Sequence, residues 1–412
     1  MQLKYLNFYK IISQFATNIV GAFVPLLIYQ ATGNLLYTFI YVTAELSLRI
    51  IMNLAFSTLY KKYPQIMLLL RVFPVLIYSL CIFILDYNLL LGVILVGFFY
   101  SMSFSFKELP MEIIFNYSSV NEDSEGSSSK GLGMSRMFEQ IGLLIAIVMG
   151  GLFLEKLGNV IPIIIAIVTY LISIVPLVIY YVKEKKNPIF NKDAVSNAIA
   201  AFKESKVKKL QEAVIKKKVL FNLSLSYFIK STVDEVTTIF MIFLFAKNPN
   251  AYSLAGYMQA AMWFMFGVGC LAYEKLSDRI DFTKPCQICA LIVSLIVVAL
   301  PFTVIYNCVP VAILLFAIMG FFYGPISSFG ISNLFAKTRI LGISNDALCH
   351  RCLGYCLARY PGFIIAMFGL PFIPYALFVS SAIQAISIYS SPKIEEKNRE
   401  LIVDYLQNNK MY

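Results

Sequence analysis

The chain has 412 residues, of which 59% are hydrophobic and 14% are charged, and its mean hydropathy is +0.75. A water-soluble protein has no way to hide so much apolar surface, so the composition excludes a soluble globular domain and indicates a multispan membrane protein. The formal net charge is +11, but the lysines lie in short loops between apolar runs, which argues against a nucleic-acid-binding face.

The first apolar segment follows Lys4 and Lys10 and extends for about 20 residues, enough to cross a bilayer. It is too long for the core of a signal peptide, and no small-residue cleavage site follows it. We therefore expect it to remain as a transmembrane helix.

Apolar runs long enough to cross roughly 30 Å of hydrocarbon recur along the whole chain. They predict twelve spans, at residues 8–30, 35–59, 65–85, 88–115, 133–154, 160–182, 219–246, 252–273, 286–306, 309–334, 344–369 and 371–390. The sequence therefore predicts an all-α membrane protein built from two six-helix bundles related by a pseudo-two-fold axis.

A polar run from Lys183 to Lys218 separates the two sets of six and carries eleven lysines against four acids. We interpret it as a cytoplasmic basic linker between an N-terminal bundle at 1–182 and a C-terminal bundle at 219–390, with a cytoplasmic tail at 391–412. Apolar residues recur within it every three to four positions, so part of it is either a surface helix against the membrane or a flexible linker.

Basic residues alternate in number from one loop to the next. With the N-terminus inside, the internal segments hold Lys61, Lys62, Lys130, the central block, Lys275, Arg279, Lys284, Lys337, Arg339, Lys393, Lys397 and Arg399, and the opposite loops hold only Lys156 and Lys247. This asymmetry predicts cytosolic termini and a multi-pass protein of the cell membrane, which we expect to be a bacterial cytoplasmic membrane.

A short repeat occurs in the fourth predicted span of each half. Gly97-Phe98-Phe99-Tyr100 in the first half corresponds to Gly320-Phe321-Phe322-Tyr323 in the second, and a phenylalanine follows at the same offset in both. Its position favours duplication over chance. Duplicated six-helix halves are typical of transporters whose site lies between them.

On these features the chain resembles the major facilitator superfamily over nearly its whole length. The resemblance implies a charged latch in the loop after the second span of each half. The first such loop, 57–65, has lost the glycines and the acid of the family pattern, whereas the second keeps Asp278-Arg279. Asp278 and Arg279 are therefore either a conformational latch or a positive-inside anchor. Span five lacks the Gly-Pro step of antiporters.

Ionisable residues inside the predicted spans mark candidate substrate or proton-coupling sites, because burying them in a bilayer is costly. In span two, Glu45 and Arg49 share a helix face and form either a neutralising pair or part of a site. In span four, Lys107 and Glu112 flank Pro110. The resemblance implies that Lys107 replaces a basic residue of proton-coupled relatives, and the alternative is an interfacial position. Arg136 and Glu139 of span five could complete a network with them.

Span seven carries Lys230, Asp234 and Glu235, which leaves one carboxylate without a partner on its own helix. We predict that this carboxylate gains and loses a proton during transport. Arg359 in span eleven needs a counter-charge, and an acid of span seven is the expected one. The intramembrane charges are close to balanced in sign, so they favour neither a cation nor an anion as substrate.

Aromatic residues and cysteines are the remaining candidates for site residues. We expect Tyr100, Trp263 and Tyr323 to line the cavity of a partly apolar substrate. Cysteines occur in two short clusters, at Cys286 and Cys289 and around His350 at Cys349, Cys352 and Cys356. We interpret the cysteines as small apolar residues, and we expect no metal site. His350, near the start of its span, is either an interfacial residue or a proton-coupling group, since its unperturbed pKa of about 6.5 suits coupling.

The sequence therefore predicts secondary active transport of a small organic molecule by alternating access, coupled to protons and directed to efflux of an amphiphilic compound. No Gly-x-x-x-x-Gly-Lys-Ser/Thr loop indicates ATP as the driver, and we expect no cofactor, no enzymatic activity and a monomer in the lipid bilayer. The alternatives are a lipid or amphiphile flippase, a permease for nutrient or metabolite uptake, and a membrane enzyme built on the cysteine and His350 group.

Overall fold

A computed structural model describes residues 3–85, 87–118, 132–185, 242, 244–245, 248–277 and 279–340, together with positions 378–379, 381–383, 385–386, 388–390, 392–393, 396–397 and 400. The described chain folds into helices joined by short turns, with no strand among these residues. Nine helical segments of this part of the chain are long and apolar enough to cross a membrane. They correspond to predicted spans one to six and eight to ten, so the all-α membrane fold is confirmed.

The first half begins with two predicted spans that the structure builds from several helices. Span one consists of α1 (Leu3–Gly21) and α2 (Val24–Thr32), and span three consists of α4 (Pro64–Leu70) and α5 (Val72–Ile84). Pro25 and Pro74 explain the two interruptions, because a proline has no backbone N–H and its ring collides with the carbonyl of the residue four positions earlier. Arg71, at the second interruption, is thereby placed between α4 and α5.

The remaining described spans are single helices. They are α3 (Leu35–Lys62), α6 (Leu89–Ser118), α7 (Leu132–Leu157) and α8 (Val160–Lys185) in the first half, and α12 (Ala251–Ser277), α13 (Thr283–Ile305) and α14 (Val309–Ile340) in the second. The turn before α3 has clear local causes. Gly33 adopts the left-handed conformation, with φ of 62°, that ends α2, and the Asn34 side chain accepts a hydrogen bond from the Leu36 amide.

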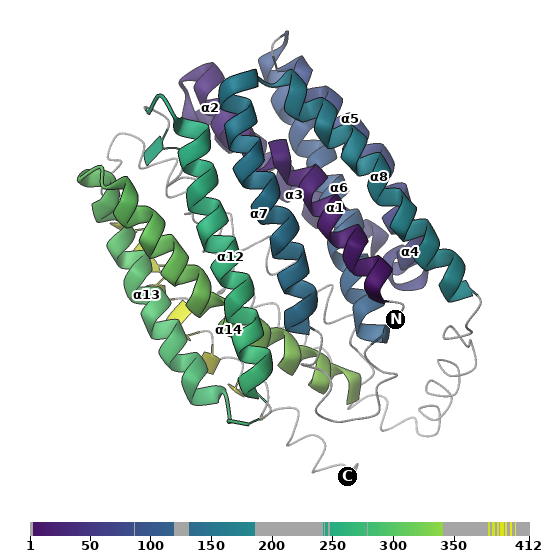
Figure 1. Cartoon of the computed structure of the whole chain (residues 1–412), viewed down its shortest axis with the longest axis vertical. Coiled ribbons are helices and arrows are strands. Elements are labelled where there is room, and N and C mark those ends of the chain that lie inside the picture. Colours follow the sequence, from purple (N-terminus) through teal and green to yellow (C-terminus); the bar gives the residue numbers. More distant parts are fainter. Residues whose placement is uncertain are drawn as a thin grey trace.

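The two halves lie side by side, with α1 to α8 on one side and α12 to α14 on the other (Figure 1). The seam between them is formed by α7 of the first half and α12 of the second, which pack along much of their length. Within the halves, α1 packs against α7 and α8, and α12 packs against α14.

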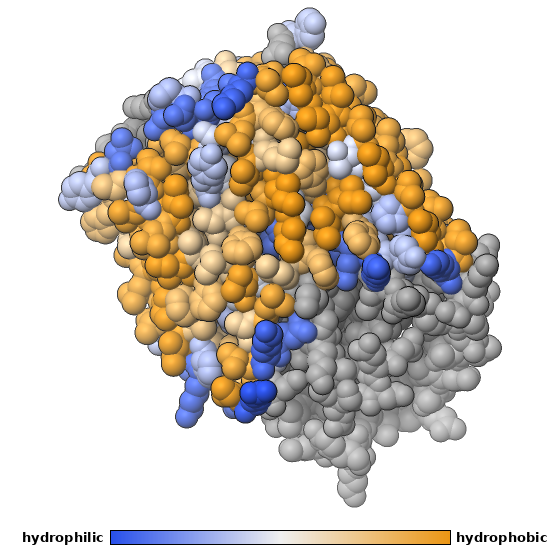
Figure 2. Space-filling model, in the orientation of Figure 1, coloured by the Kyte–Doolittle hydropathy of each residue, from blue (hydrophilic) through white to orange (hydrophobic). Residues whose placement is uncertain are grey.

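Apolar residues cover much of the described face of the bundle in Figure 2. Exposed apolar side chains recur at helical spacing along the outer faces of α8 and α13, namely Ile161, Ile164, Val168, Leu171, Ile172 and Val175 on α8 and Ile288, Leu291, Leu295, Val298, Phe302 and Ile305 on α13. In water such a surface would be unstable, whereas hydrocarbon chains can cover it. The protein is therefore a multi-pass membrane protein.

The repeated tetrapeptides occupy corresponding places in the two halves. Gly97 of α6 lies against α3, where a Cβ atom would come within 3.0 Å of the Tyr41 carbonyl oxygen. Gly320 of α14 lies against α12, where a Cβ atom would come within 2.1 Å of the Met262 carbonyl oxygen. In each half the fourth span thus uses its glycine to approach the second span, as the duplication predicts.

These two glycines give a graded prediction for stability. Gly320→Ala is expected to destabilise the protein by about 1–3 kcal/mol, because the added methyl group overlaps the α12 backbone and the helices must separate. Gly97→Ala has more room, so a smaller loss is expected, offset in part by the better helix propensity of alanine. Thermal unfolding of both purified variants in detergent measures the difference. A Gly320→Ala protein as stable as wild type would contradict the close approach of α12 and α14.

Candidate functional site

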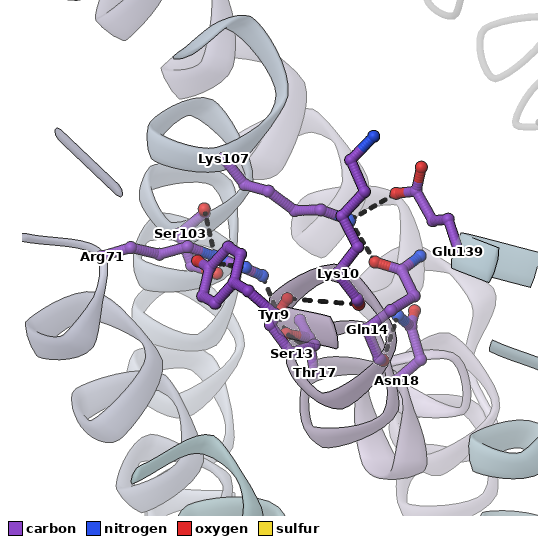
Figure 3. A network of polar contacts seen from close by, with 10 residues as sticks. All are labelled: Tyr9, Lys10, Ser13, Gln14, Thr17, Asn18, Arg71, Ser103, Lys107 and Glu139. Carbon is purple, nitrogen blue, oxygen red and sulfur yellow. Dashed lines mark hydrogen bonds and ion pairs between the residues drawn. The ribbon is translucent and has the colours of Figure 1, made fainter. Parts of the chain in front are cut away.

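A network of polar side chains connects three helices inside the first half (Figure 3). The Lys107 ammonium on α6 donates to Gln14 Oε1 on α1 and to Glu139 Oε1 on α7, the latter at 2.6 Å. The exposed fraction is 8% for the Lys107 side chain and 25% for that of Glu139. Lys107 is therefore buried within the bundle, and the side chain of its partner Glu139 is partly exposed.

Two further cations lie close to the Glu139 carboxylate. The Lys10 side chain on α1 is buried and interacts electrostatically with Glu139, Lys107 and Glu112, and Arg136 acts on Glu139 from one turn earlier on α7. We call Lys10, Gln14, Lys107 and Glu139 the Lys107 network. Each charge of the network thus depends on the others for compensation, so a change of charge at Glu139 alters the balance across α1, α6 and α7.

Close helix packing brings the Lys107 network together. Gly142 on α7 is three residues from Glu139, and a Cβ atom there would come within 2.4 Å of the Ile11 carbonyl oxygen on α1. Only glycine allows the two backbones to approach so closely. Gly142 therefore lets α7 bring Glu139 close to the polar face of α1 that carries Lys10 and Gln14.

A second polar cluster surrounds Arg71 and was not identified from the sequence. The Arg71 guanidinium is buried, and it donates from Nε to the Ser103 carbonyl oxygen at 3.0 Å, from Nη2 to Thr17 Oγ1 at 2.8 Å and from Nη1 to the Tyr9 hydroxyl at 3.4 Å (Figure 3). The guanidinium carbon also lies 5.4 Å from the centroid of the Tyr170 ring. The sequence did contain a sign of this cluster, because Arg71 is a charged residue within an apolar run and lies three residues before Pro74.

In span two, Glu45 and Arg49 form a buried ion pair along α3. The Arg49 guanidinium also lies over the Phe104 ring of α6 at 3.8 Å, and the Ser101 hydroxyl donates to the Glu45 backbone carbonyl at 2.6 Å. The pair predicted from the four-residue spacing is therefore formed. These contacts attach it to α6, so it stabilises the packing of α3 in addition to neutralising two charges.

Two polar contacts cross the seam between the halves. Near one end, the Glu155 carboxylate of α7 accepts from the Ser253 amide at 3.1 Å and from its hydroxyl at 2.7 Å, at the start of α12. Nearer the other end, the Arg136 guanidinium donates to Ser327 Oγ of α14 at 2.9 Å and lies 5.9 Å from the Phe266 ring of α12. The seam is thus held by polar contacts at two widely separated levels.

The predicted aromatic residues fall into two groups. Tyr100 packs beside Tyr78 within the first half, with ring centroids 5.3 Å apart. Trp263 and Tyr323 both contact Phe266 in the second half, with centroids 5.6 and 5.8 Å apart. All three predicted residues are half-buried, so each keeps some accessible surface. Trp263 and Tyr323 lie on the same side of the seam as the residues that Arg136 contacts.

Several predicted residues lie outside the described part of the chain, namely Lys230, Asp234, Glu235, Asp278, Cys349, His350, Cys352, Cys356 and Arg359. Arg279, the second member of the predicted latch, is exposed in the turn after α12, where its amide donates to the Leu276 carbonyl at 2.9 Å. Cys286 is buried on α13. Within the described ranges no three His, Cys, Asp or Glu side chains lie close enough together to hold a metal ion.

Membrane-spanning helices in two groups, with buried charges inside one group and polar contacts across the seam, are typical of a membrane carrier. Residues 124–343, more than half of the chain, match the sequence profile of the Major Facilitator Superfamily. The chain therefore belongs to this superfamily and is a secondary transporter. Members of the superfamily are carriers of small molecules, some moved together with protons, and are not enzymes. No curated protein sequence matches the chain.

Solved structures share the fold at low sequence identity. One is a bacterial homologue of the iron transporter ferroportin in its outward-facing state, with a TM-score of 0.68 and 12% identity over 97% of this chain and 100% of that one. Another is the E. coli fucose:proton symporter FucP, with a TM-score of 0.59 and 13% identity over 96% of this chain and 98% of that one. At these identities the comparisons establish the fold alone.

Proposed function

We propose that this secondary transporter is coupled to protons and exports an amphiphilic organic compound across a bacterial cytoplasmic membrane. The observation that carries the proposal is Glu139, whose carboxylate lies within a membrane span and bonds to the buried Lys107, and whose side chain is 25% exposed. A carboxylate that is both inside the bundle and reachable by solvent can exchange a proton as the access side changes.

Protonation of Glu139 changes the charge balance of the Lys107 network. When ionised, Glu139 connects α7 to Lys107 of α6 and offsets the nearby Lys10 and Arg136. When neutral, it leaves three cations facing one another with less compensation, which favours a different arrangement of α1, α6 and α7. Because α7 also forms the seam with the second half, that rearrangement is transmitted to α12.

The comparisons and the aromatic residues support the remaining parts of the proposal. The structural relative FucP is a fucose:proton symporter, which makes proton coupling compatible with this fold. Half-buried rings at Trp263 and Tyr323, beside Phe266, provide apolar contact area for an amphiphilic substrate. An uptake permease or a flippase would use the same fold, and the direction of transport distinguishes them.

The acids of span seven remain proposed coupling residues beside Glu139. Asp234 or Glu235 would pair with Arg359 and the other with Lys230, giving the second half a network of its own. Glu45 and Glu112 are further candidates in the first half, and Asp278 with Arg279 is the proposed latch. Asp234→Asn and Glu235→Gln variants that both transport normally under a proton gradient would remove span seven from the coupling mechanism.

A two-stage experiment tests the proposed function. Thermal unfolding of the purified protein in detergent is first measured against a panel of drugs and metabolites, because a bound ligand stabilises the native state by mass action. Compounds that raise the melting temperature are then offered to proteoliposomes without ATP under an imposed pH gradient. Accumulation that collapses on adding a protonophore supports the proposal. Accumulation that is insensitive to the protonophore contradicts proton coupling.

The orientation of the chain is tested by labelling single cysteines on a cysteine-free background. Substitution of Phe190 by cysteine in the central basic segment is expected to give no labelling by an impermeant maleimide added to intact cells, because this segment is proposed to be cytosolic. A cysteine replacing Pro249, in the turn before α12, is expected to label. The reverse pattern would place both termini outside.

A further inference from the structure

Arg136 reaches from the first half of the molecule into the second. It extends from α7 to Ser327 Oγ on α14, at 2.9 Å, and to the Phe266 ring on α12, at 5.9 Å. The residue is half-buried. Arg136, one turn before Glu139 on α7, thus connects the surroundings of the Lys107 network to the opposite half of the protein.

The contacts described for Arg136 across the seam, to Ser327, Phe266 and the Cys270 thiol, are to groups without a charge. The two ion pairs found among the described residues join Glu45 to Arg49 and Lys107 to Glu139, and Arg136 belongs to neither. Glu139 acts on Arg136 electrostatically but accepts its short hydrogen bond from Lys107. A guanidinium at the junction of α7, α12 and α14 therefore has donor capacity and positive charge that a carboxylate of a ligand can use.

An aromatic surface adjoins the Arg136 guanidinium. The Phe266 ring centroid lies 5.9 Å from the guanidinium carbon, and the rings of Trp263 and Tyr323 pack against Phe266 with centroids 5.6 and 5.8 Å from its own. Trp263 and Tyr323 are half-buried. An aromatic acid can be recognised by such an arrangement. The guanidinium offers a cation for the acidic group, and the three neighbouring rings offer flat apolar area for the body of the molecule.

An unsatisfied polar atom lies one turn along α7 from Arg136. Gln140 is buried, and its side-chain carbonyl oxygen has no hydrogen-bond partner in the described structure. The side chain lies against Gly267 of α12, where a Cβ atom would be 3.3 Å from Gln140 Cβ. A buried acceptor without a donor costs free energy, and a hydroxyl or N–H group of a ligand can satisfy it.

We infer that the junction of α7, α12 and α14 is the substrate site and that it takes an amphiphilic organic anion, an aromatic carboxylic acid being the simplest example. Arg136 binds the carboxylate in exchange for its bond to Ser327, the rings around Phe266 contact the apolar body, and Gln140 accepts from a donor on the ligand. This inference rests on the proposed transport function and adds the charge of the substrate to it.

Matched acids and amides test the inference in the purified full-length protein. Benzoate, 2-naphthoate and 9-anthroate, each paired with its neutral primary amide, are titrated in detergent while binding is followed by thermal unfolding and calorimetry. The acids are expected to bind and to stabilise the protein, with the larger rings binding more tightly, and the amides at least about tenfold more weakly. Equal binding of acids and amides, or no binding of any acid, would overturn the inference.

Variants assign the effect to Arg136. Arg136→Gln is expected to weaken acid binding at least about tenfold, and Arg136→Lys to keep part of it, because the charge remains but the paired donors are lost. Lys156→Gln, a matched loss of charge at an exposed position of α7, is expected to bind like wild type. Undiminished acid binding by Arg136→Gln would refute the role of Arg136.

Ser327→Ala provides a test that does not depend on Arg136 variants folding. The substitution removes the neutral partner that competes for the guanidinium, so acids are expected to bind roughly 2–10-fold more tightly, the equivalent of one hydrogen bond. Weaker acid binding would show that Ser327 serves the ligand rather than competing with it.

Transport of only cations or neutral compounds would refute the anion site and leave the transport function intact, whereas no transport of any compound would refute both.

Discussion

Glu139→Gln is expected to abolish substrate accumulation driven by a pH gradient in proteoliposomes while leaving the exchange of substrate across the membrane largely intact. The amide cannot gain or lose a proton, yet it keeps the size of the side chain and can still accept a hydrogen bond from Lys107. Exchange requires only that the loaded carrier change sides, whereas accumulation requires the proton step. The two measurements therefore separate coupling from transport.

The control for this prediction removes the charge of an acid away from the network. Glu396→Gln, at an exposed position, is expected to accumulate substrate like wild type under the same gradient. Accumulation by Glu139→Gln at the wild-type level would move the coupling step to another acid, and loss of both accumulation and exchange would make Glu139 a residue needed for substrate binding or folding.

Lys107→Met is expected to lower the stability of the protein by roughly 3 kcal/mol. The substitution leaves the Glu139 carboxylate inside the bundle without its hydrogen-bonded cation, and removing one partner of a buried ion pair costs more than the pair itself contributes. Because 25% of the Glu139 side chain is exposed and Lys10 lies nearby, the loss is expected at the lower end of the range for buried pairs. Thermal unfolding in detergent measures the loss.

The double variant Lys107→Met with Glu139→Gln shows whether the unpaired charge causes this loss. Since the amide needs no counter-charge, the second substitution is expected to recover a large part of the stability that the first removes. Lys156→Met, an exposed lysine of α7, is expected to have a small effect. Additive losses in the double variant would mean that Lys107 and Glu139 stabilise the protein independently.

The fold was predictable because hydropathy and charge report directly on the membrane. Apolar runs of about 20 residues identified the nine spans that the structure describes. Helix breaks within a run were less visible, since Pro74 interrupts span three while the apolar run continues through it. The break matters for the site, because it positions Arg71 among Tyr9, Thr17 and Ser103.

Pairs along one helix were predictable, and pairs between helices were only partly so. The four-residue spacing of Glu45 and Arg49 specifies a contact regardless of how the helices pack, and the pair is formed. Lys107 and Glu139 are 32 residues apart, so their contact depends on how α6 and α7 converge. The sequence offered a network as one reading and an interfacial lysine as another, and the close approach at Gly142 decides in favour of the network.

The contacts of Arg136 could not be derived from the sequence. A residue at the start of span five has no periodic relation to Ser327 or Phe266, which belong to the other half of the duplicated chain. Only the packing of α7 against α12 brings them together, with Gly256 and Gly267 on α12 permitting the approach. Those contacts give the seam a positive charge that the near balance of charges along the sequence did not predict.

Proton movement linked to substrate movement is the most direct test of the account. Proteoliposomes containing the purified protein and an entrapped pH indicator are given a compound identified by the stability screen, with no pH gradient and no ATP. The account predicts that substrate movement changes the internal pH in wild type and that Glu139→Gln moves substrate without this change. Substrate movement without any pH change in wild type, or an unchanged pH response in Glu139→Gln, would contradict it.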